Sequence, residues 1–343
     1  MTSSMRVRSK SRLLIIAITI GILLLILTSQ LPMMQFFTMF GGKASVFATI
    51  FLGIFIEAIP FLLLGTLGSG FVEAFIEHDR LQRWIPRNAI TGALAGSLLG
   101  MIFPVCECGV VPLARRLFNK GLPVSAGVAF LLAAPVLNPI VILSTAAAFG
   151  WGWMLVGRLG LSLLIAMTTG VFFSIVKSPT EVLLPSQWLH KDAIPLQTLE
   201  PSKAQYSVGE KLKQVTVIAA DEFYEMGRFL ILGAALAAAM QTLIPQELLV
   251  QVGRGPVTSV LVMLALAVIL SICSTVDAFV ALGFVNVFSP GAIIAFLIFG
   301  PMVDIKTTLM YLSVFKKRPV IYLILFPLFI SLLAGLLINL LIV

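Results

Sequence analysis

The fold of this chain is decided by one ten-residue stretch, FPVCECGVVP at residues 103–112. It places two thiols, a carboxylate, a glycine and two prolines inside an otherwise apolar segment. An acid at the centre of a bilayer costs about 2.5–3.5 kcal/mol on insertion scales, so Glu107 is by default a functional residue. Pro104 and Pro112 interrupt the backbone hydrogen bonds, which is tolerated at membrane depth only inside protein or beside a water-filled cavity. The stretch therefore predicts a broken helix, with Pro104, Gly109 and Pro112 at the break, beside a transport or redox site.

The composition of the whole chain requires a membrane. Of the 343 residues, 59% are hydrophobic and only 11% are charged, which is more apolar surface than one soluble core could bury. The net charge of +8 fits basic residues gathered in cytoplasmic loops. Because these residues are scattered and not interleaved with aromatic ones, nucleic acid is not expected as a partner. The three cysteines lie at predicted membrane depth, which argues against an extracellular disulfide framework.

Apolar runs predict an all-α polytopic membrane protein with about eight or nine membrane segments. The runs cover roughly 13–31, 46–76, 89–119, 122–149, 151–176, 215–244, 257–289, 291–313 and 319–343. Basic residues precede the first run, which is long for a signal peptide, so we expect an uncleaved span and a cytoplasmic N-terminus. The chain then divides into a tail with the first span (1–45), a first half (46–176), a polar proline-containing linker (177–214) and a second half (215–343).

The two halves resemble each other in sequence. Polar and proline landmarks recur at offsets of 166–168 residues: Glu57 with Glu225, Cys106 with Cys273, Pro135 with Pro301, and Asn138 with Asp304. An internal duplication places a substrate site at the interface between the repeats, often built from discontinuous helices near the midplane of the membrane. We therefore expect each half to contribute a Glu, a Cys at a helix break, and an Asn or Asp that follows a proline.

Positive charges favour inverted repeats. Arg115 and Arg116 should be cytoplasmic, which requires segment 89–119 to enter and return as a re-entrant hairpin broken at the Cys-Glu-Cys turn. By the repeat, 257–289 would be a hairpin from the opposite side, broken at 271–277, and the linker would be cytoplasmic. In the alternative both segments span fully, which gives parallel repeats and an external linker.

The polar residues of the two halves form the candidate site. Thiolates prefer soft ions such as Cu(I), Zn(II) and trivalent arsenic-like centres, so Cys106 and Cys108 are candidate metal ligands. They converge only where the backbone is unwound, and the simpler alternative is that each is a small buried hydrophobe. The predicted transport residues are Cys106, Glu107, Cys108, Cys273, Asp277, Asn138, Asp304, Glu57 and Glu225, with further helix breaks at Pro135 and Pro301.

The acidic and amide residues have two interpretations. The carboxylates could carry coupling protons, or they could pair with Lys306 and Arg228. Asn138 and Asp304 could contact the substrate, or they could satisfy backbone groups freed where the helix bends. No Ser/His/Asp set or His-rich metal motif is present, so neither hydrolytic enzyme chemistry nor a cofactor is expected.

Three segments carry a family resemblance. PVCECGVVPLARR at 104–116 and FLLAAPVLNPIVI at 130–142 resemble the signatures of a bacterial predicted permease family, which includes the DUF318 group and the ArsP-type organoarsenical efflux permeases. CSTVDAFV at 273–280 resembles its second-half signature. The resemblance, which begins near residue 46, implies a plasma-membrane permease with about eight spans. It also implies arsenical resistance by efflux for some members, and for some a second permease subunit; a homo-oligomer is the other expectation.

Two functions from different classes remain open at this point. The first is a secondary transporter, coupled to a proton or substrate gradient, that moves a soft metal ion, a metalloid or a thiol-bearing solute between the halves. The second is a transmembrane thiol–disulfide relay between Cys106 and Cys273, which needs their Cα atoms within about 7 Å and should not need Glu57 or Asn138. A third alternative, a membrane scaffold, is disfavoured by the cost of so many intramembrane polar groups.

Overall fold

The computed structural model describes residues 32–76, 86, 88–102, 105–175, 179–184, 208–243 and 255–342. It divides the chain into two compact units, Met1–Ile50 and Phe51–Val343, and the second contains every candidate site residue. The predicted first span at 13–31, residue Pro104 and most of the 177–214 linker lie outside the described residues. Within the described part, all regular elements are helices, and the only β-type pairing is an isolated bridge between Leu183 and Phe315.

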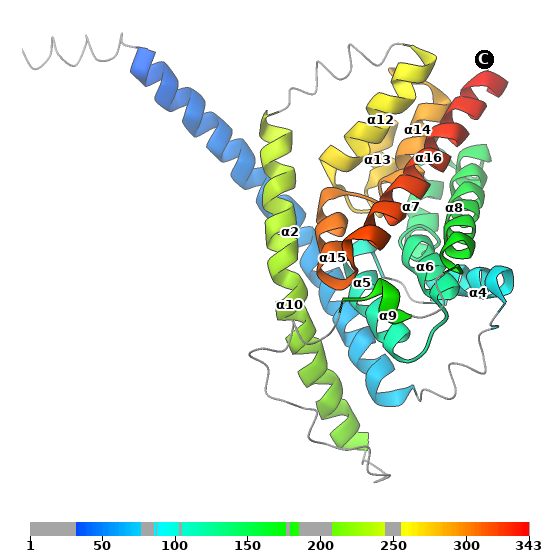
Figure 1. Ribbon diagram of the computed structural model, residues 1–343. Helices are drawn as coiled ribbons and strands as arrows, with labels where there is room; N and C mark the ends of the chain where they lie inside the picture. The colour runs from blue at the N-terminus through cyan, green and yellow to red at the C-terminus, as the bar shows by residue number, and fades with distance from the viewer. Residues whose placement is uncertain are drawn as a thin grey trace, which may run out of the picture. The chain divides into compact units, whose positions relative to one another are not determined.

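Runs of short helices stand between the long helices (Figure 1). In chain order they are α2 Pro32–Phe75, α4 Ala89–Ile102, α5 Glu107–Asn119, α6 Val124–Ala133, α7 Pro139–Phe149, α8 Trp153–Phe173, α9 Pro179–Val182, α10 Val208–Leu243, α12 Pro256–Leu270, α13 Asp277–Leu282, α14 Pro290–Phe299, α15 Ile305–Val314 and α16 Lys317–Ile342.

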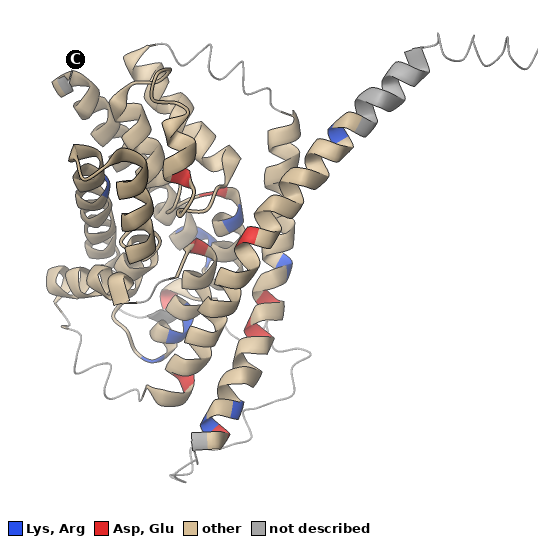
Figure 2. Ribbon diagram, turned by 180° about the vertical axis from the view of Figure 1, so that it is seen from behind, with Lys and Arg blue, Asp and Glu red and all other residues tan. Residues whose placement is uncertain are grey.

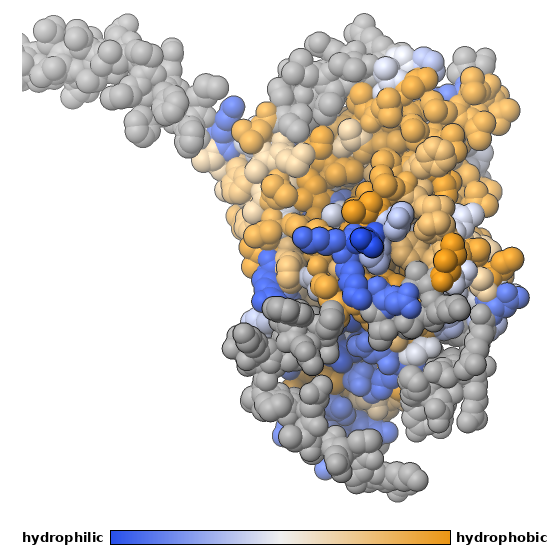
Figure 3. All heavy atoms as spheres, in the orientation of Figure 1, coloured by the Kyte–Doolittle hydropathy of each residue, from blue (hydrophilic) through white to orange (hydrophobic). Residues whose placement is uncertain are grey.

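Among the described residues, four helical stretches are long and apolar enough to cross a membrane, judged by length and composition: Gly42–Phe75, Trp153–Phe173, Gly209–Leu243 and Lys317–Leu341. Five of the remaining helices are apolar but shorter, namely α4, α6, α7, α12 and α14. Large hydrophobic side chains on α16 are exposed, including Leu340 at 79% and Phe329 at 61%. On the face shown in Figure 3, hydrophobic residues dominate the upper part and hydrophilic ones gather below them. The chain is therefore a helical, multi-pass membrane protein.

Each of four predicted membrane segments consists of two short helices separated by a break. Segment 89–119 contains α4 and α5, segment 122–149 contains α6 and α7, and the second half repeats this order with α12, α13, α14 and α15. At the break before α5, Cys106 is extended, with φ −81° and ψ −179°. Pro135 lies in the turn after α6, and Pro301 lies in the turn after α14.

The sequence predicted helix breaks at Gly109 and Pro112, but the helix is continuous at both residues. Both residues lie inside α5, which begins at Glu107 and continues to Asn119. Proline removes one N–H donor and crowds the carbonyl four residues earlier, but here the helix continues past it. The extended residue is Cys106, so Cys106 precedes the helix while Glu107 and Cys108 belong to its first turn.

The short helices exchange partners between the halves. Within the first half, α4, α6 and α8 pack together, and within the second half α12, α14 and α16 do the same. In contrast, α5 of the first half packs on α15 of the second, and α13 of the second half packs on α7 of the first. These two crossings bring the residues next to the helix breaks of both halves together.

Candidate functional site

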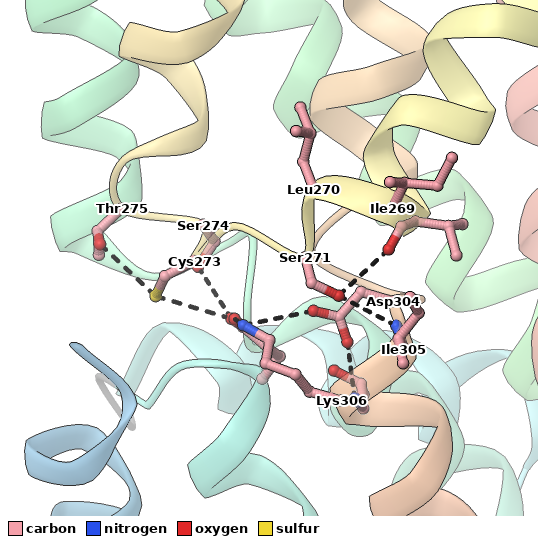
Figure 4. Close-up of polar contacts among 12 residues, drawn as sticks. Ile269, Leu270, Ser271, Cys273, Ser274, Thr275, Asp304, Ile305 and Lys306 are labelled. Atoms are coloured by element: carbon pink, nitrogen blue, oxygen red, sulfur yellow. Dashed lines mark hydrogen bonds and ion pairs between the residues drawn. The ribbon is translucent and has the colours of Figure 1, made fainter. Parts of the chain in front are cut away.

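Glu107 lies at the centre of the candidate site. It is the first residue of α5 and only 1% exposed. Its Oε1 atom lies 3.5 Å from Nζ of Lys306, the second residue of α15. The same ammonium lies 3.4 Å from Oδ2 of Asp304. Lys306 is therefore ion-paired with two buried carboxylates from different halves. These ion pairs lie where α5 packs on α15 (Figure 4).

The loop between α12 and α13 contributes a thiol and a hydroxyl. The thiol of Cys273 lies 4.0 Å from Oε2 of Glu107, and the hydroxyl of Ser274 donates to the same oxygen at 3.5 Å. Thr275 donates to the Cys273 sulfur at 3.6 Å. In Figure 4 the Cys273 and Ser274 side chains lie on the side of the yellow loop ribbon that faces the Lys306 ammonium, and Thr275 points toward the Cys273 sulfur.

A strained residue starts this loop. Ser271 has left-handed backbone angles, φ 47° and ψ 43°, and it is the one non-glycine with positive φ in the described part of the chain. That conformation costs an L-residue roughly 1–3 kcal/mol and is found mostly at functional sites. The Ser271 hydroxyl accepts a hydrogen bond from the Ile305 amide at 3.2 Å. The break after α12 is thereby fixed to the start of α15.

Three potential ligands from the two halves meet beside Glu107. One ligand atom each of Cys106, Glu107 and Cys273 lie within 4.8 Å of one another, and all three residues are buried. The cysteines are free thiols. Cys108 is also buried and interacts with Cys106, but it is not a member of this group. The sequence predicted Cys106 and Cys108 as a ligand pair. In the structure, Cys106 also groups with Glu107 and with Cys273 of the second half. Two thiols and one carboxylate suit a soft or borderline cation better than Ca²⁺ or Mg²⁺.

Asn138 and Asp304 occupy equivalent positions as helix caps. The Asn138 side chain accepts a hydrogen bond from the Ile140 amide at 2.9 Å, and Asp304 accepts one from the Thr307 amide at 2.6 Å. Each satisfies a backbone donor left free at a helix start. Asp304 also faces Lys306 through its second oxygen. Asp304 is therefore part of the Glu107 group, whereas the Asn138 side chain acts as a helix cap.

The two repeated glutamates differ in their surroundings. Glu225 on α10 accepts from Arg115 of α5 with both oxygens at 3.1 Å, within a group of ion pairs that also joins Arg116 to Glu222 at 2.5 Å. Glu225 is thus held at the far end of α5 from Glu107. Glu57 lies on α2, and its Oε1 atom is buried with no hydrogen-bond partner among the described residues. Figure 2 shows that most of the ribbon is uncharged and that α10 carries several of the acids and bases.

Two buried charges were missed by the sequence argument, Glu222 and Arg158. Arg158 on α8 is fully buried; its Nη2 donates to Oδ2 of Asp277 at 2.6 Å and its Nη1 donates to the Thr145 hydroxyl at 2.8 Å. The signal was present, because Arg158 interrupts the apolar run at 151–176, and a lone arginine in a membrane span is a functional hypothesis in its own right. Asp277, which the sequence did identify, is the first residue of α13.

Comparison with known proteins now decides the family. Residues 43–340 match a family described as predicted permease, which covers the whole site. The chain belongs to this predicted permease family. It is 44% identical over 292 residues to the UPF0718 protein YcgR of Bacillus subtilis, covering 85% of this chain and 96% of that protein. It is 37% identical over 276 residues to a Streptococcus mutans protein named a putative two-component membrane permease complex subunit, covering 78% and 87% of the two chains.

A more distant relative covers only part of the permease. The UPF0718 protein YraQ of Escherichia coli is 29% identical over 119 residues, which is about a third of each chain. No solved structure matches this permease significantly. The family assignment therefore identifies a membrane permease, and the geometry of the site carries the argument about what it moves.

Proposed function

We propose that this permease moves a small soft solute, namely a soft metal ion, a metalloid or an organoarsenical, through a site held between its two halves. The observation that carries the proposal is the approach of Cys106, Glu107 and Cys273 to within 4.8 Å of one another. The first two residues come from the break before α5 and the third from the break after α12. A soft thiophilic centre bound there would contact both repeats at once.

The same arrangement supports alternating access. Transporters built from repeats commonly place the substrate between discontinuous helices and rock one repeat against the other. Because the ligand group draws on both halves, a relative movement of the halves would assemble or disperse it. Lys306 neutralises Glu107; a bound cation would compete with that ammonium. We assign the halves as inverted repeats and the linker to the cytoplasm, on the distribution of the arginines.

A second subunit is also part of the proposal. The Streptococcus mutans relative is named as one subunit of a two-component membrane permease complex. The alignment covers 87% of that protein, so the aligned region includes nearly all of it. We extend the two-component organisation to this permease, with a second membrane protein as the partner.

The test is cellular accumulation of a defined panel: Cu(I), Zn(II) and a trivalent phenylarsenical. Cells would contain the wild-type permease, Cys106→Ser, Glu107→Gln, Glu222→Gln or no permease, at matched protein levels. Glu222 is the matched control, since it is a buried, ion-paired carboxylate outside the ligand group. We expect one species to change with wild type and Glu222→Gln and to revert with the other two variants. No change in any species would reject a soft solute.

A thiol–disulfide relay is the second candidate, because the same short separation brings Cys106 and Cys273 together. Forming a disulfide removes two electrons and two protons from the thiols, so a working relay must populate the oxidised pair. Because all three cysteines are buried in the folded chain, working cells would be quenched in acid and the denatured protein alkylated. The permease predicts that all three thiols are alkylated without prior reduction, whereas the relay predicts a protected fraction that reduction releases.

A further inference from the structure

Arg158 joins three helices beside the candidate site. The guanidinium of this α8 residue donates to Asp277 on α13 at 2.6 Å and to Thr145 on α7 at 2.8 Å. The first contact links the two halves, since α8 and α7 belong to the first and α13 to the second. Arg158 is completely buried, and its Nε has no hydrogen-bond partner among the described residues. The position of the guanidinium is therefore set by these two contacts.

Asp277 transmits this anchor to Cys273. Its side chain accepts from Arg158, while its backbone amide donates to the Cys273 carbonyl at 3.1 Å. The Val276 amide donates to the same carbonyl at 3.0 Å. Asp277 thus holds the main chain of Cys273 through its amide, and its own side chain is held by Arg158. The thiol at the end of this chain of contacts lies 4.0 Å from Glu107.

The alternative is that Arg158 only neutralises Asp277. A neutralising role needs one charge contact, whereas Arg158 makes a second, directed hydrogen bond to Thr145 on a third helix. Planar guanidinium groups are suited to fixing geometry in this way, because their donors have fixed directions. Loss of such a positioning contact displaces the groups it holds, and displacement by about 1 Å can lower a rate a hundredfold.

We propose that Arg158 is a positioning residue that holds Cys273 against Cys106 and Glu107 and so sets the spacing of the thiols between the halves. The proposal rests on the proposed function in that these thiols are taken as solute ligands. The primary test of this role for Arg158 does not measure transport, so the positioning proposal and the proposed function can fail separately.

The test measures disulfide formation between the two thiols in the purified protein. The chain has three cysteines, so Cys108→Ser leaves Cys106 and Cys273 as its only thiols. In this background a mild oxidant, copper phenanthroline, is added and the cross-link is followed by mass spectrometry. We expect Arg158→Gln and Asp277→Asn each to slow cross-linking by about tenfold or more. The double variant should be no slower than the slower single one, because the two act through one contact.

Control variants separate positioning from general damage. Glu222→Gln and Arg116→Gln remove the partners of another Arg–Glu pair, in which Glu222 is buried and Arg116 is partly exposed, and should leave the cross-linking rate within about twofold of the parent. Arg158→Lys keeps the charge and should recover part of the rate. If Arg158→Gln does not fold, Asp277→Asn and Thr145→Val carry the test. Unchanged cross-linking in folded Arg158→Gln or Asp277→Asn would overturn the proposal, as would equal slowing in the Arg116→Gln control.

Discussion

At the scale of single residues, the charges around Glu107 are unevenly matched. Lys306 is the ammonium for both Glu107 and Asp304, at 3.5 and 3.4 Å. Removing one partner of a buried ion pair leaves an uncompensated charge and typically costs about 3–5 kcal/mol. We expect Lys306→Met to lower the stability of the purified protein by this amount, measured as loss of folded protein on heating.

A second substitution tests whether the lost stability comes from the carboxylates left without an ammonium. Adding Glu107→Gln to Lys306→Met removes one of the two orphaned carboxylates and should restore part of the lost stability. Lys211→Met is the matched control, because Lys211 lies over the Phe75 ring and remains partly exposed. A Lys306→Met protein as stable as the control would show that the buried carboxylates do not need the ammonium.

Single residues also show what the sequence could reveal and what it could not. The cost of an acid at membrane depth led the sequence argument to Glu107 and Asp277, and the duplication led it to Cys273; the structure buries all three. The sequence could not separate a cap from a ligand, and the structure shows Asn138 capping α7. It could not pair Glu225 with Arg115 either, because that contact depends on how α5 and α10 pack rather than on any local pattern.

At the scale of helices, two close approaches hold the site in place. A methyl group added at Gly65 of α2 would overlap the backbone of Gly109 in α5, and one added at Gly233 of α10 would lie 2.8 Å from the Lys306 Cα. We expect Gly65→Ala and Gly233→Ala each to cost about 1–3 kcal/mol through overpacking and to reduce solute flux. Thermal unfolding and flux would be measured together.

The same two helices provide matched controls. A methyl group added at Gly68 of α2 or at Gly227 of α10 would have nothing within 4 Å. Gly68→Ala and Gly227→Ala should therefore match wild type or be slightly more stable, since alanine is the better helix former. Equal losses in all four variants would mean that glycine in these helices is needed for something other than close approach.

Helix breaks were only partly readable from the sequence. The breaks predicted at Pro135 and Pro301 coincide with turns, and each proline lies just after the end of a short helix. Pro112 gave the wrong position, because a proline within α5 removes one N–H while the remaining bonds and the packing of α5 keep the helix together. The break after α12 contains no proline; it was predicted at 271–277 from the duplication alone, and it begins at left-handed Ser271.

At the scale of the whole molecule, the short helices exchange partners between the halves, which is the arrangement expected if the halves are the repeats proposed from the sequence. The crossing of α5 with α15 then has its counterpart in the crossing of α13 with α7. Inverted repeats would place the linker at 177–214 in the cytoplasm. A reporter fused at Gln197, which lies outside the described residues, should read as cytoplasmic; an extracytoplasmic reading would favour parallel repeats.

The most direct test of the central claim is tracer flux of the identified solute into vesicles that contain the purified permease. The variants are Cys106→Ser from the first half and Cys273→Ser from the second, with Glu222→Gln as the control. Removing a residue that hydrogen-bonds to a metal ligand typically lowers metal affinity or activity by about 10–100-fold. Removing Cys106 or Cys273, the proposed ligands themselves, should therefore lower flux at least about tenfold, while Glu222→Gln retains its flux. Full flux in Cys273→Ser with loss in Cys106→Ser would contradict a site shared between the halves.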